Sequence, residues 1–217
     1  MRNDHTELVK FLAETKGCFH VSYNGIAFDS QVLESILRTA SILPKICAGG
    51  EEMAKMIYIK AQEVIDRSDM KEFQEVPEWK LSHRQVDVFK LNHWDNPAKR
   101  SSLKWIQYSM DWKNMQEMPI NHTAKITTWE QLNMIISYCQ NDVSSTKEIM
   151  KRSKEQILLR RDLSKEYGIN LYRASEPKIS RELFSYFLSE KLKIPKYELK
   201  QLKTHRQQIK ISNIILP

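Results

Sequence analysis

The chain has 217 residues, which suits one domain of ordinary size or one domain with an extension. Apolar residues make up 41% and charged residues 28%, a balance that is typical of a globular protein and excludes wholesale disorder. No run approaches the roughly 20 apolar residues that span a bilayer, and the first residues lack an apolar signal core, so we expect a cytoplasmic protein without membrane segments.

The positive charge is concentrated towards the C-terminus. The formal net charge is +7, and residues 151–217 hold 16 basic against 7 acidic residues. A basic segment attracts phosphate backbones through counterion release. A solvated basic surface explains the same excess, so charge alone leaves nucleic-acid binding and a plain basic face open.

The N-terminal part predicts a short helix followed by a strand–turn–helix unit. Apolar residues over 8–12 form one helical face, and residues 18–23 have the composition of a buried strand. After a turn, apolar residues at helical spacing over 32–37 predict a second helix, which Asp29 or Ser30 can cap. A carboxylate therefore lies where the strand gives way to the helix.

The later elements follow from the same periodicity, with two strands and four helices. Only two strands fall in the first 150 residues, which is too few for a sheet that supports these helices. A capping box, from Thr128 with Gln131 or Thr127 with Glu130, predicts the start of the longest helix. The predicted strands are 85–90, with Asp87 near its middle, and 209–216, and the predicted helices are 51–65, 103–110, 129–167 and 176–188.

Tyr138 and Asp142 are four residues apart in the longest predicted helix, so they project from the same face. The neighbouring Ile135 and Cys139 indicate that this face is partly buried. A carboxylate there needs a metal ion, a cation or a hydrogen-bond donor. Taken singly, the pair also fits ordinary core packing, and Asp29 also fits a helix cap.

Together the two segments resemble the second and third motifs of the DEDD exonucleases, the proofreading superfamily of DNA polymerases. The second motif has an Asn, a short gap, an aromatic residue and an Asp, which are here Asn24, Phe28 and Asp29. The third motif, in its tyrosine variant, has a Tyr four positions before the final Asp, which are here Tyr138 and Asp142.

The resemblance implies the fold and its organisation. It implies an α/β, RNase H-like mixed sheet flanked by helices over residues 1–152, followed by a basic helical extension over 153–217 that begins the polymerase region. The stretches 174–179, 203–206 and 211–217 are similar to the linker of phage-type DNA polymerases.

The resemblance also implies two-metal hydrolysis of the 3′ end of DNA. Two divalent ions about 3.5–4 Å apart stabilise the attacking and leaving oxygens of a phosphodiester, and Mg²⁺ or Mn²⁺ suits carboxylate ligands. By the family pattern, Asp142 binds the ion that activates water, and Asp29 reaches the second ion. Tyr138 orients the attacking water, and Asn24 and Phe28 shape the path of the 3′ end.

The family's first motif, an Asp-x-Glu on the leading strand, has no counterpart in this sequence. It should precede the helix at 8–12, where Asp4 and Glu7 are spaced three apart and lie in no strand pattern. We therefore expect a sheet that is incomplete at its N-terminus and an incomplete metal site. The expected origin is one piece of a split or truncated phage polymerase, acting with the remaining polymerase segments on primer-template DNA in the host cytoplasm.

Two features remain open, and so do two other functions. For Asp87, in the second predicted strand, we favour a structural role over a catalytic one. The mixture of cations and aromatic residues over 92–104 is typical of single-strand grooves, and a loop with a capped helix explains it equally well. The alternatives are a non-catalytic DNA-binding replication accessory protein and a free-standing exonuclease for DNA or RNA ends.

Overall fold

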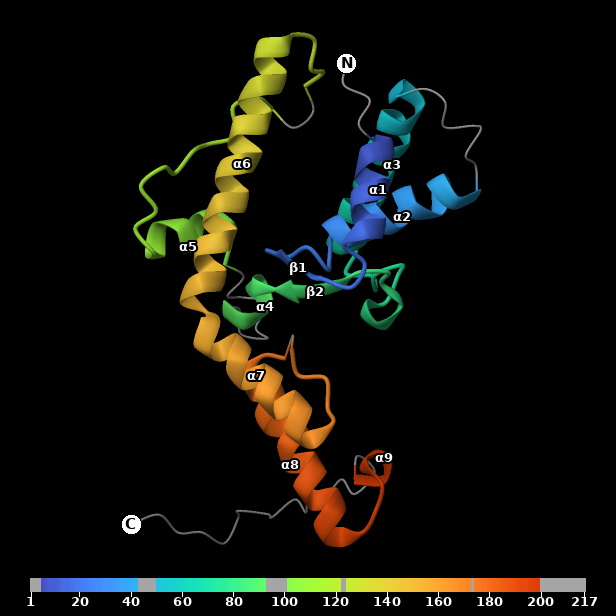
Figure 1. Cartoon of the computed structure of the whole chain (residues 1–217), viewed down its shortest axis with the longest axis vertical. Coiled ribbons are helices and arrows are strands. Elements are labelled where there is room, and N and C mark those ends of the chain that lie inside the picture. The colour runs from blue at the N-terminus through green and yellow to red at the C-terminus, as the bar shows by residue number, and fades with distance from the viewer. Residues whose placement is uncertain (1–4, 43–49, 93–100, 122–123, 173, 200–217) are drawn as a thin grey trace, which may run out of the picture. The chain divides into compact units, whose positions relative to one another are not determined.

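The computed structural model describes residues 5–42, 50–92, 101–121, 124–172 and 174–199 (Figure 1). The chain divides into two compact units, residues 1–175 and 176–217. The described part is mixed α/β and mostly helical, with one small parallel sheet. Three stretches discussed above lie outside the described residues: the predicted strand at 209–216, the stretch 203–206, and residues 93–100 of the stretch 92–104.

The first unit places its two strands between runs of helices. The described part of the crossover from the first strand to the second contains two α-helices and one short 3-10 helix, η1 (Glu78–Lys80), and parallel strands need a long connection of this kind. The elements are α1 (His5–Glu14), β1 (Phe19–Ser22), α2 (Asp29–Ile42), α3 (Gly50–Asp69), β2 (Arg84–Asp87), α4 (Val88–Asn92), α5 (Leu103–Ser109), α6 (Trp129–Arg152) and α7 (Lys154–Tyr167).

β1 and β2 pair in parallel, with Val21 opposite Val86 and Ser22 opposite Asp87. The prediction of two strands in the first 150 residues is confirmed for the described residues. The prediction that the first strand is buried is wrong, because Phe19 and Val21 are exposed. β2 is the covered strand, since its last three residues are buried.

The second strand is shorter than predicted and ends at Asp87. Residues 88–90, which the sequence pattern assigned to the second half of the strand, belong to α4. The reason is a side-chain hydrogen bond: the backbone N–H of Phe89 donates to the Asp87 carboxylate at 3.0 Å, as in a helix N-cap. Asp87 therefore turns the chain from strand to helix.

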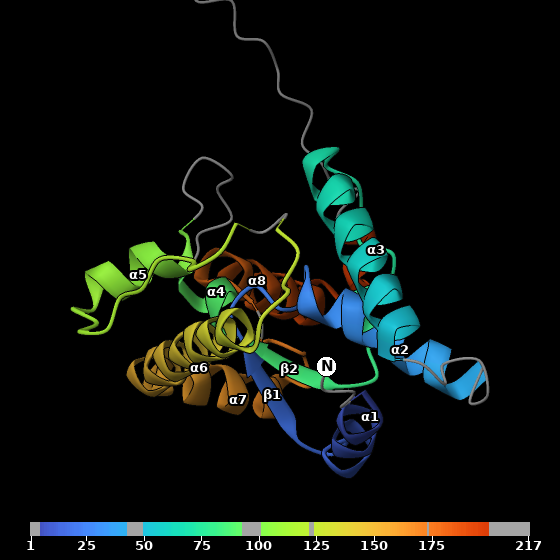
Figure 2. The same ribbon diagram turned by 90° about the horizontal axis from the view of Figure 1, so that it is seen from above.

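The main core joins β2 and α4 to α5 and α6. Figure 2 shows α4 and α6 beside the strands, in agreement with the contacts between α4, α6 and β1. Because this core fixes α6 against the strands, it also fixes the residues that α6 carries. Its buried members are Val86, Val88, Leu91, Met110 and Ile149.

The long C-terminal helix predicted over 129–167 is two helices. Its start is confirmed, since Thr128 and Gln131 form a complete capping box. The break is at Ser153, whose ψ of 8° leaves the helical range between α6 and α7. Gly168 ends α7 with a left-handed φ of 67°, directly after the range 129–167 predicted as helical.

The described part of the second unit contains α8 (Glu176–Leu192) and α9 (Lys196–Leu199). These two helices pack on each other, and Lys196 forms an ion pair with Glu182. Across the described residues of both units, no helix has the length and apolar character needed to cross a membrane.

Candidate functional site

The loop that follows β1 has a backbone that few residue types accept. Asn24 has a left-handed φ of 60°, which asparagine tolerates better than most residues. At Gly25 an added Cβ would lie 2.3 Å from the Ser22 hydroxyl oxygen, so only glycine fits there without movement. The turn itself therefore accounts for the presence of Asn24 and Gly25 at these two positions.

Asp87 holds this loop from inside the protein. Its side chain is buried at 1% exposure, and it accepts backbone hydrogen bonds from Asn24 at 2.7 Å and from Ile26 at 3.5 Å. Burial raises the pKa of the Asp87 carboxyl group, although these hydrogen bonds and that of Phe89 oppose the shift. The favoured structural role of Asp87 agrees with these contacts.

Phe28 and Asp29 lie at the start of α2. Phe28 is half-buried, and Asp29 is the first residue of the helix and is exposed at its surface. The protein around the Asp29 carboxyl group still raises its pKa by desolvation. An incoming cation would favour the ionised form of such a carboxyl group.

Tyr138 and Asp142 lie side by side on α6, as their spacing predicted. The Tyr138 hydroxyl donates a hydrogen bond to the Asp142 carboxylate. Burial, followed by the charge of Asp142 and this hydrogen bond, raises the pKa of Tyr138 to about 12. The phenol therefore keeps its proton at neutral pH.

Two residues of α5 reach the same pair. The Gln107 side-chain amide donates to Asp142 Oδ1 at 3.1 Å and to the Ser145 hydroxyl at 2.8 Å. The Lys104 ammonium lies 5.2 Å from the centre of the Tyr138 ring, within range of a cation–π contact. The pair on α6 is thus contacted by one amide and one cation from a neighbouring helix.

An open groove of about 1080 Å³ begins at the β1–α2 loop. Its walls come from that loop, from the end of α3 and the segment after it, from α4 and from the start of α5. The wall residues include polar and aromatic side chains and three cations, namely Tyr23, Asn24, Phe73, Phe89, Arg67, Lys71, Lys90 and Ser102.

The groove is tied together across long sequence distances. The Tyr23 hydroxyl donates to the carbonyl of Ser101 at 2.7 Å, which links the β1–α2 loop to the residues just before α5. Phe73 is 95% exposed in the groove wall. Of the cations, Arg67 forms an ion pair with Glu72 at 3.7 Å, while Lys90 lies over the Phe89 ring.

The expected site residues are therefore brought together in two groups. Asn24 lines the groove, Phe28 and Asp29 follow it in the same loop and helix start, and Tyr138 and Asp142 touch each other on α6. Within the described residues, no hydrogen bond or ion pair joins Asp29 to Asp142. Sequence reasoning missed Gln107, and it included Lys104 in the mixed stretch 92–104 without placing it beside Tyr138. Gln107 was detectable as a polar residue on the apolar face of Leu103, Ile106 and Met110.

The donor set bears on the expected metal ions. Over the described ranges, no three His, Cys, Asp or Glu side chains are grouped closely enough to hold an ion between them. Mg²⁺ sites that act on phosphates often use one or two carboxylates, with water and substrate oxygens completing the shell. The carboxylate oxygens of Asp142, and separately those of Asp29, are of the ligand type that such sites use.

Comparisons with known protein families, with curated proteins and with solved structures found no match to this chain.

Proposed function

We propose that this chain is the exonuclease part of a proofreading DNA polymerase, with an incomplete RNase H-like fold, and that it acts on the 3′ end of single-stranded DNA. The observation that carries the proposal is the Tyr138–Asp142 pair on α6, whose carboxylate is anchored by Gln107. A carboxylate held at a fixed angle beside a protonated phenol suits the handling of a water molecule and a divalent cation.

The roles follow from the chemistry of each group. Asp142 and Asp29 would hold Mg²⁺ or Mn²⁺, and these ions would supply an activated water and charge stabilisation at the phosphodiester. Tyr138, as a neutral phenol, would orient the attacking water. Asn24 and Phe28, at the loop that opens the groove, would contact the last nucleotides of the strand.

The groove supports single-stranded DNA as the substrate. Single-strand sites combine cations that follow the backbone with aromatic rings on which bases stack. Lys71 and Lys90 supply cations and the exposed Phe73 supplies a ring, all in the groove wall next to Asn24. The basic C-terminal third would add electrostatic attraction to the rest of a primer-template.

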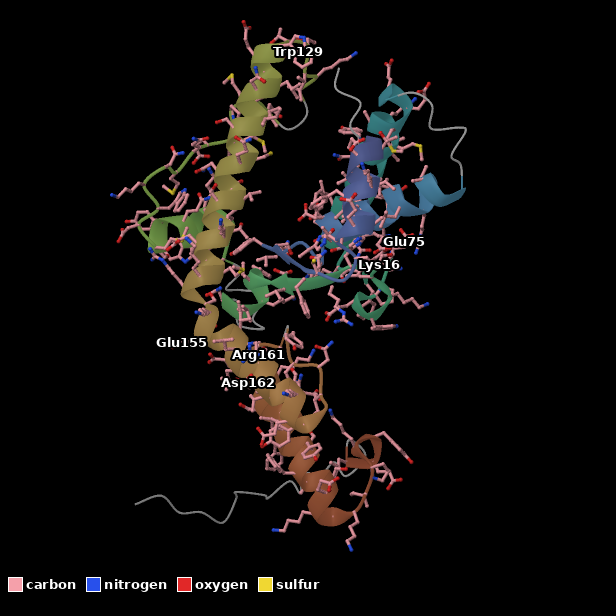
Figure 3. The ribbon with its side chains drawn as sticks, in the orientation of Figure 1. Lys16, Glu75, Trp129, Glu155, Arg161 and Asp162 are labelled. Atoms are coloured by element: carbon pink, nitrogen blue, oxygen red, sulfur yellow. The ribbon has the colours of Figure 1, made fainter. Side chains whose placement is uncertain are left out.

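The test is release of mononucleotides from a 3′-labelled single strand in Mn²⁺ or Mg²⁺. We expect slow release by the wild-type chain, since the sequence has no Asp-x-Glu motif, and loss of release in Asp142→Asn. Asp162→Asn is the matched control, because Asp162 carries the same charge on α7, beside Arg161 (Figure 3). Release that is unchanged in Asp142→Asn would contradict the site assignment.

The second candidate is a non-catalytic DNA-binding accessory protein. It is favoured by the lack of a three-ligand group in the described part of the chain and by the basic C-terminal third. It predicts no mononucleotide release, together with salt-dependent DNA binding that is indifferent to Mn²⁺ and to Asp29→Asn or Asp142→Asn. A dependence of DNA binding on Mn²⁺ that Asp142→Asn abolishes would exclude it.

A further inference from the structure

Gln107 is a buried amide that costs stability. Its side chain has 0% exposure, and its Oε1 has no hydrogen-bond partner among the described residues. A buried polar atom without a partner loses its hydration and receives nothing in exchange. Native proteins contain few such atoms, so each one calls for an explanation.

The orientation of the amide is set by its neighbours. An ionised carboxylate only accepts hydrogen bonds, so the group that faces Asp142 Oδ1 at 3.1 Å must be the NH₂ end of Gln107. Turning the amide to satisfy its oxygen would place two acceptors against each other. The unsatisfied oxygen is therefore a consequence of holding Asp142.

Packing alone does not explain the residue. Gln107 lies in the core-facing part of α5, where an apolar side chain of the same volume would avoid the buried oxygen. Ser145 does not require it either, because the Ser145 hydroxyl already donates to the backbone carbonyl of Asp142 at 2.9 Å. The hydrogen bond to the Asp142 carboxylate is therefore the remaining interaction that a glutamine at this position provides.

Gln31 shows what a structural buried amide looks like in the same protein. It is also buried, at 2% exposure, but both ends of its amide are used. Its nitrogen donates to the carbonyls of Ile26 and Val76, and its oxygen accepts from the backbone N–H of Val76 at 3.0 Å. Gln31 therefore ties two segments together, whereas Gln107 is only half satisfied.

We infer that Gln107 is a positioning residue, which holds the carboxylate of Asp142 at the angle needed to bind a divalent cation. The inference rests on the proposed function, since it concerns the same carboxylate. A hydrogen bond from a fixed donor orients a ligating carboxylate and is commonly worth about 10- to 100-fold in metal affinity. The unsatisfied oxygen of Gln107 is the cost in stability of that orientation.

The experiment compares Gln107→Met with the wild-type chain. Methionine matches glutamine in length and flexibility but has no amide, so the core stays filled. We expect Mn²⁺ affinity, measured from the free-ion signal in electron paramagnetic resonance, to fall roughly 10- to 100-fold. The midpoint of urea unfolding without metal should stay the same or rise, because the buried unsatisfied oxygen is gone.

Two control variants separate positioning from general stability. Ser145→Ala removes the second acceptor of the amide and leaves its bond to Asp142, so Mn²⁺ affinity should be unchanged. Gln31→Met removes satisfied hydrogen bonds and should lower the urea midpoint. If Gln107→Met lowers the urea midpoint as Gln31→Met does, the residue is structural and the inference is overturned.

The same measurements separate this inference from the proposed function. If Asp142→Asn weakens Mn²⁺ binding and Gln107→Met does not, the positioning role fails and the metal assignment stands. If Asp142→Asn binds Mn²⁺ as tightly as the wild-type chain, the metal assignment fails and the positioning role fails with it. Weaker binding in both variants, with an unchanged urea midpoint for Gln107→Met, supports both.

Discussion

At the scale of single residues, the proposed site involves carboxylates in contrasting surroundings. Asp87 is buried and occupied by backbone N–H groups, which suits a fixed structural role. Asp29 is exposed, and Asp142 is partly exposed and contacts Tyr138 and Gln107. The environments therefore leave Asp29 and Asp142 accessible to a ligand and remove Asp87 from consideration.

The Tyr138–Asp142 contact predicts a titration. In the folded protein the pKa of Tyr138 is about 12, against about 10 in an unfolded chain. Burial is the largest cause of the shift and stays in place in Asp142→Asn, so loss of the negative charge should lower the pKa of Tyr138 only part of the way towards 10. Carbon-13 NMR of labelled tyrosine follows the titration, with Tyr138→Phe to assign the signal and Asp162→Asn as a charge control. A wild-type pKa near 10 would contradict the contact.

The raised pKa of Tyr138 also makes the stability of the folded protein depend on pH. The folded state keeps the Tyr138 proton more tightly than the unfolded state does, so the unfolded state binds fewer protons between about pH 10 and pH 12. The contribution of Tyr138 to the free energy of unfolding is therefore constant below about pH 10 and falls as the pH rises through that window.

At the scale of elements, α5 is short and depends on its cap. Helices of seven residues do not hold themselves together in water, so packing and caps decide whether they form. The Ser102 hydroxyl accepts a hydrogen bond from the backbone N–H of Trp105 at 3.1 Å and so caps the N-terminus of the helix. This cap supports the helix that presents Lys104 and Gln107 to α6.

Removing that cap should weaken the fold measurably. We expect Ser102→Ala to lower the free energy of unfolding by about 1 kcal/mol, the usual value for an N-cap serine. Urea denaturation measures the difference. Ser109→Ala is the control, because the Ser109 hydroxyl only donates back to the carbonyl of Trp105 within the same helix. Equal effects of the two substitutions would show that the cap contributes nothing specific.

The elements also show what the sequence could predict. Periodicity and caps located the longer helices because those signals are local, as at the capping box of Thr128 and Gln131. The short helices α4 and α9 were not predicted. The end of β2 was missed because it depends on the Asp87 side chain bonding to the backbone of Phe89, which alternation does not record. The break at Ser153 was missed because the apolar periodicity continues across it.

At the scale of the whole molecule, the groove brings together parts of the chain that are far apart in sequence. It joins the β1–α2 loop, the segment after α3, α4 and the start of α5 within the first unit. The pair on α6 was predictable because four-residue spacing is a helix property. The groove and the contacts of Gln107 with Asp142 and Ser145 were not predictable, since both depend on which helices pack together.

The groove predicts a selective loss of DNA binding. If bases stack on Phe73, Phe73→Ala should weaken binding of a single-stranded oligonucleotide by about 1–3 kcal/mol. Trp79→Ala is a matched control, because Trp79 is also highly exposed, at 82%, and is not part of the groove wall. Fluorescence anisotropy at fixed salt measures both affinities. A larger loss of affinity for Trp79→Ala than for Phe73→Ala would mean that the DNA strand binds outside the groove.

The hold of Asp87 on the β1–α2 loop also bears on how fast the site forms. Asn24 and Asp87 are separated by 63 residues in the sequence, and the paired residues of β1 and β2, such as Ser22 and Asp87, are separated by 65. A chain closes so long a loop only after losing much of its freedom, and non-local contacts of this kind slow folding. The left-handed turn at Asn24 gains its anchor only when the two strands meet. The helices can therefore form early in folding, and the loop that bears Asn24 and leads to Asp29 takes its final shape late.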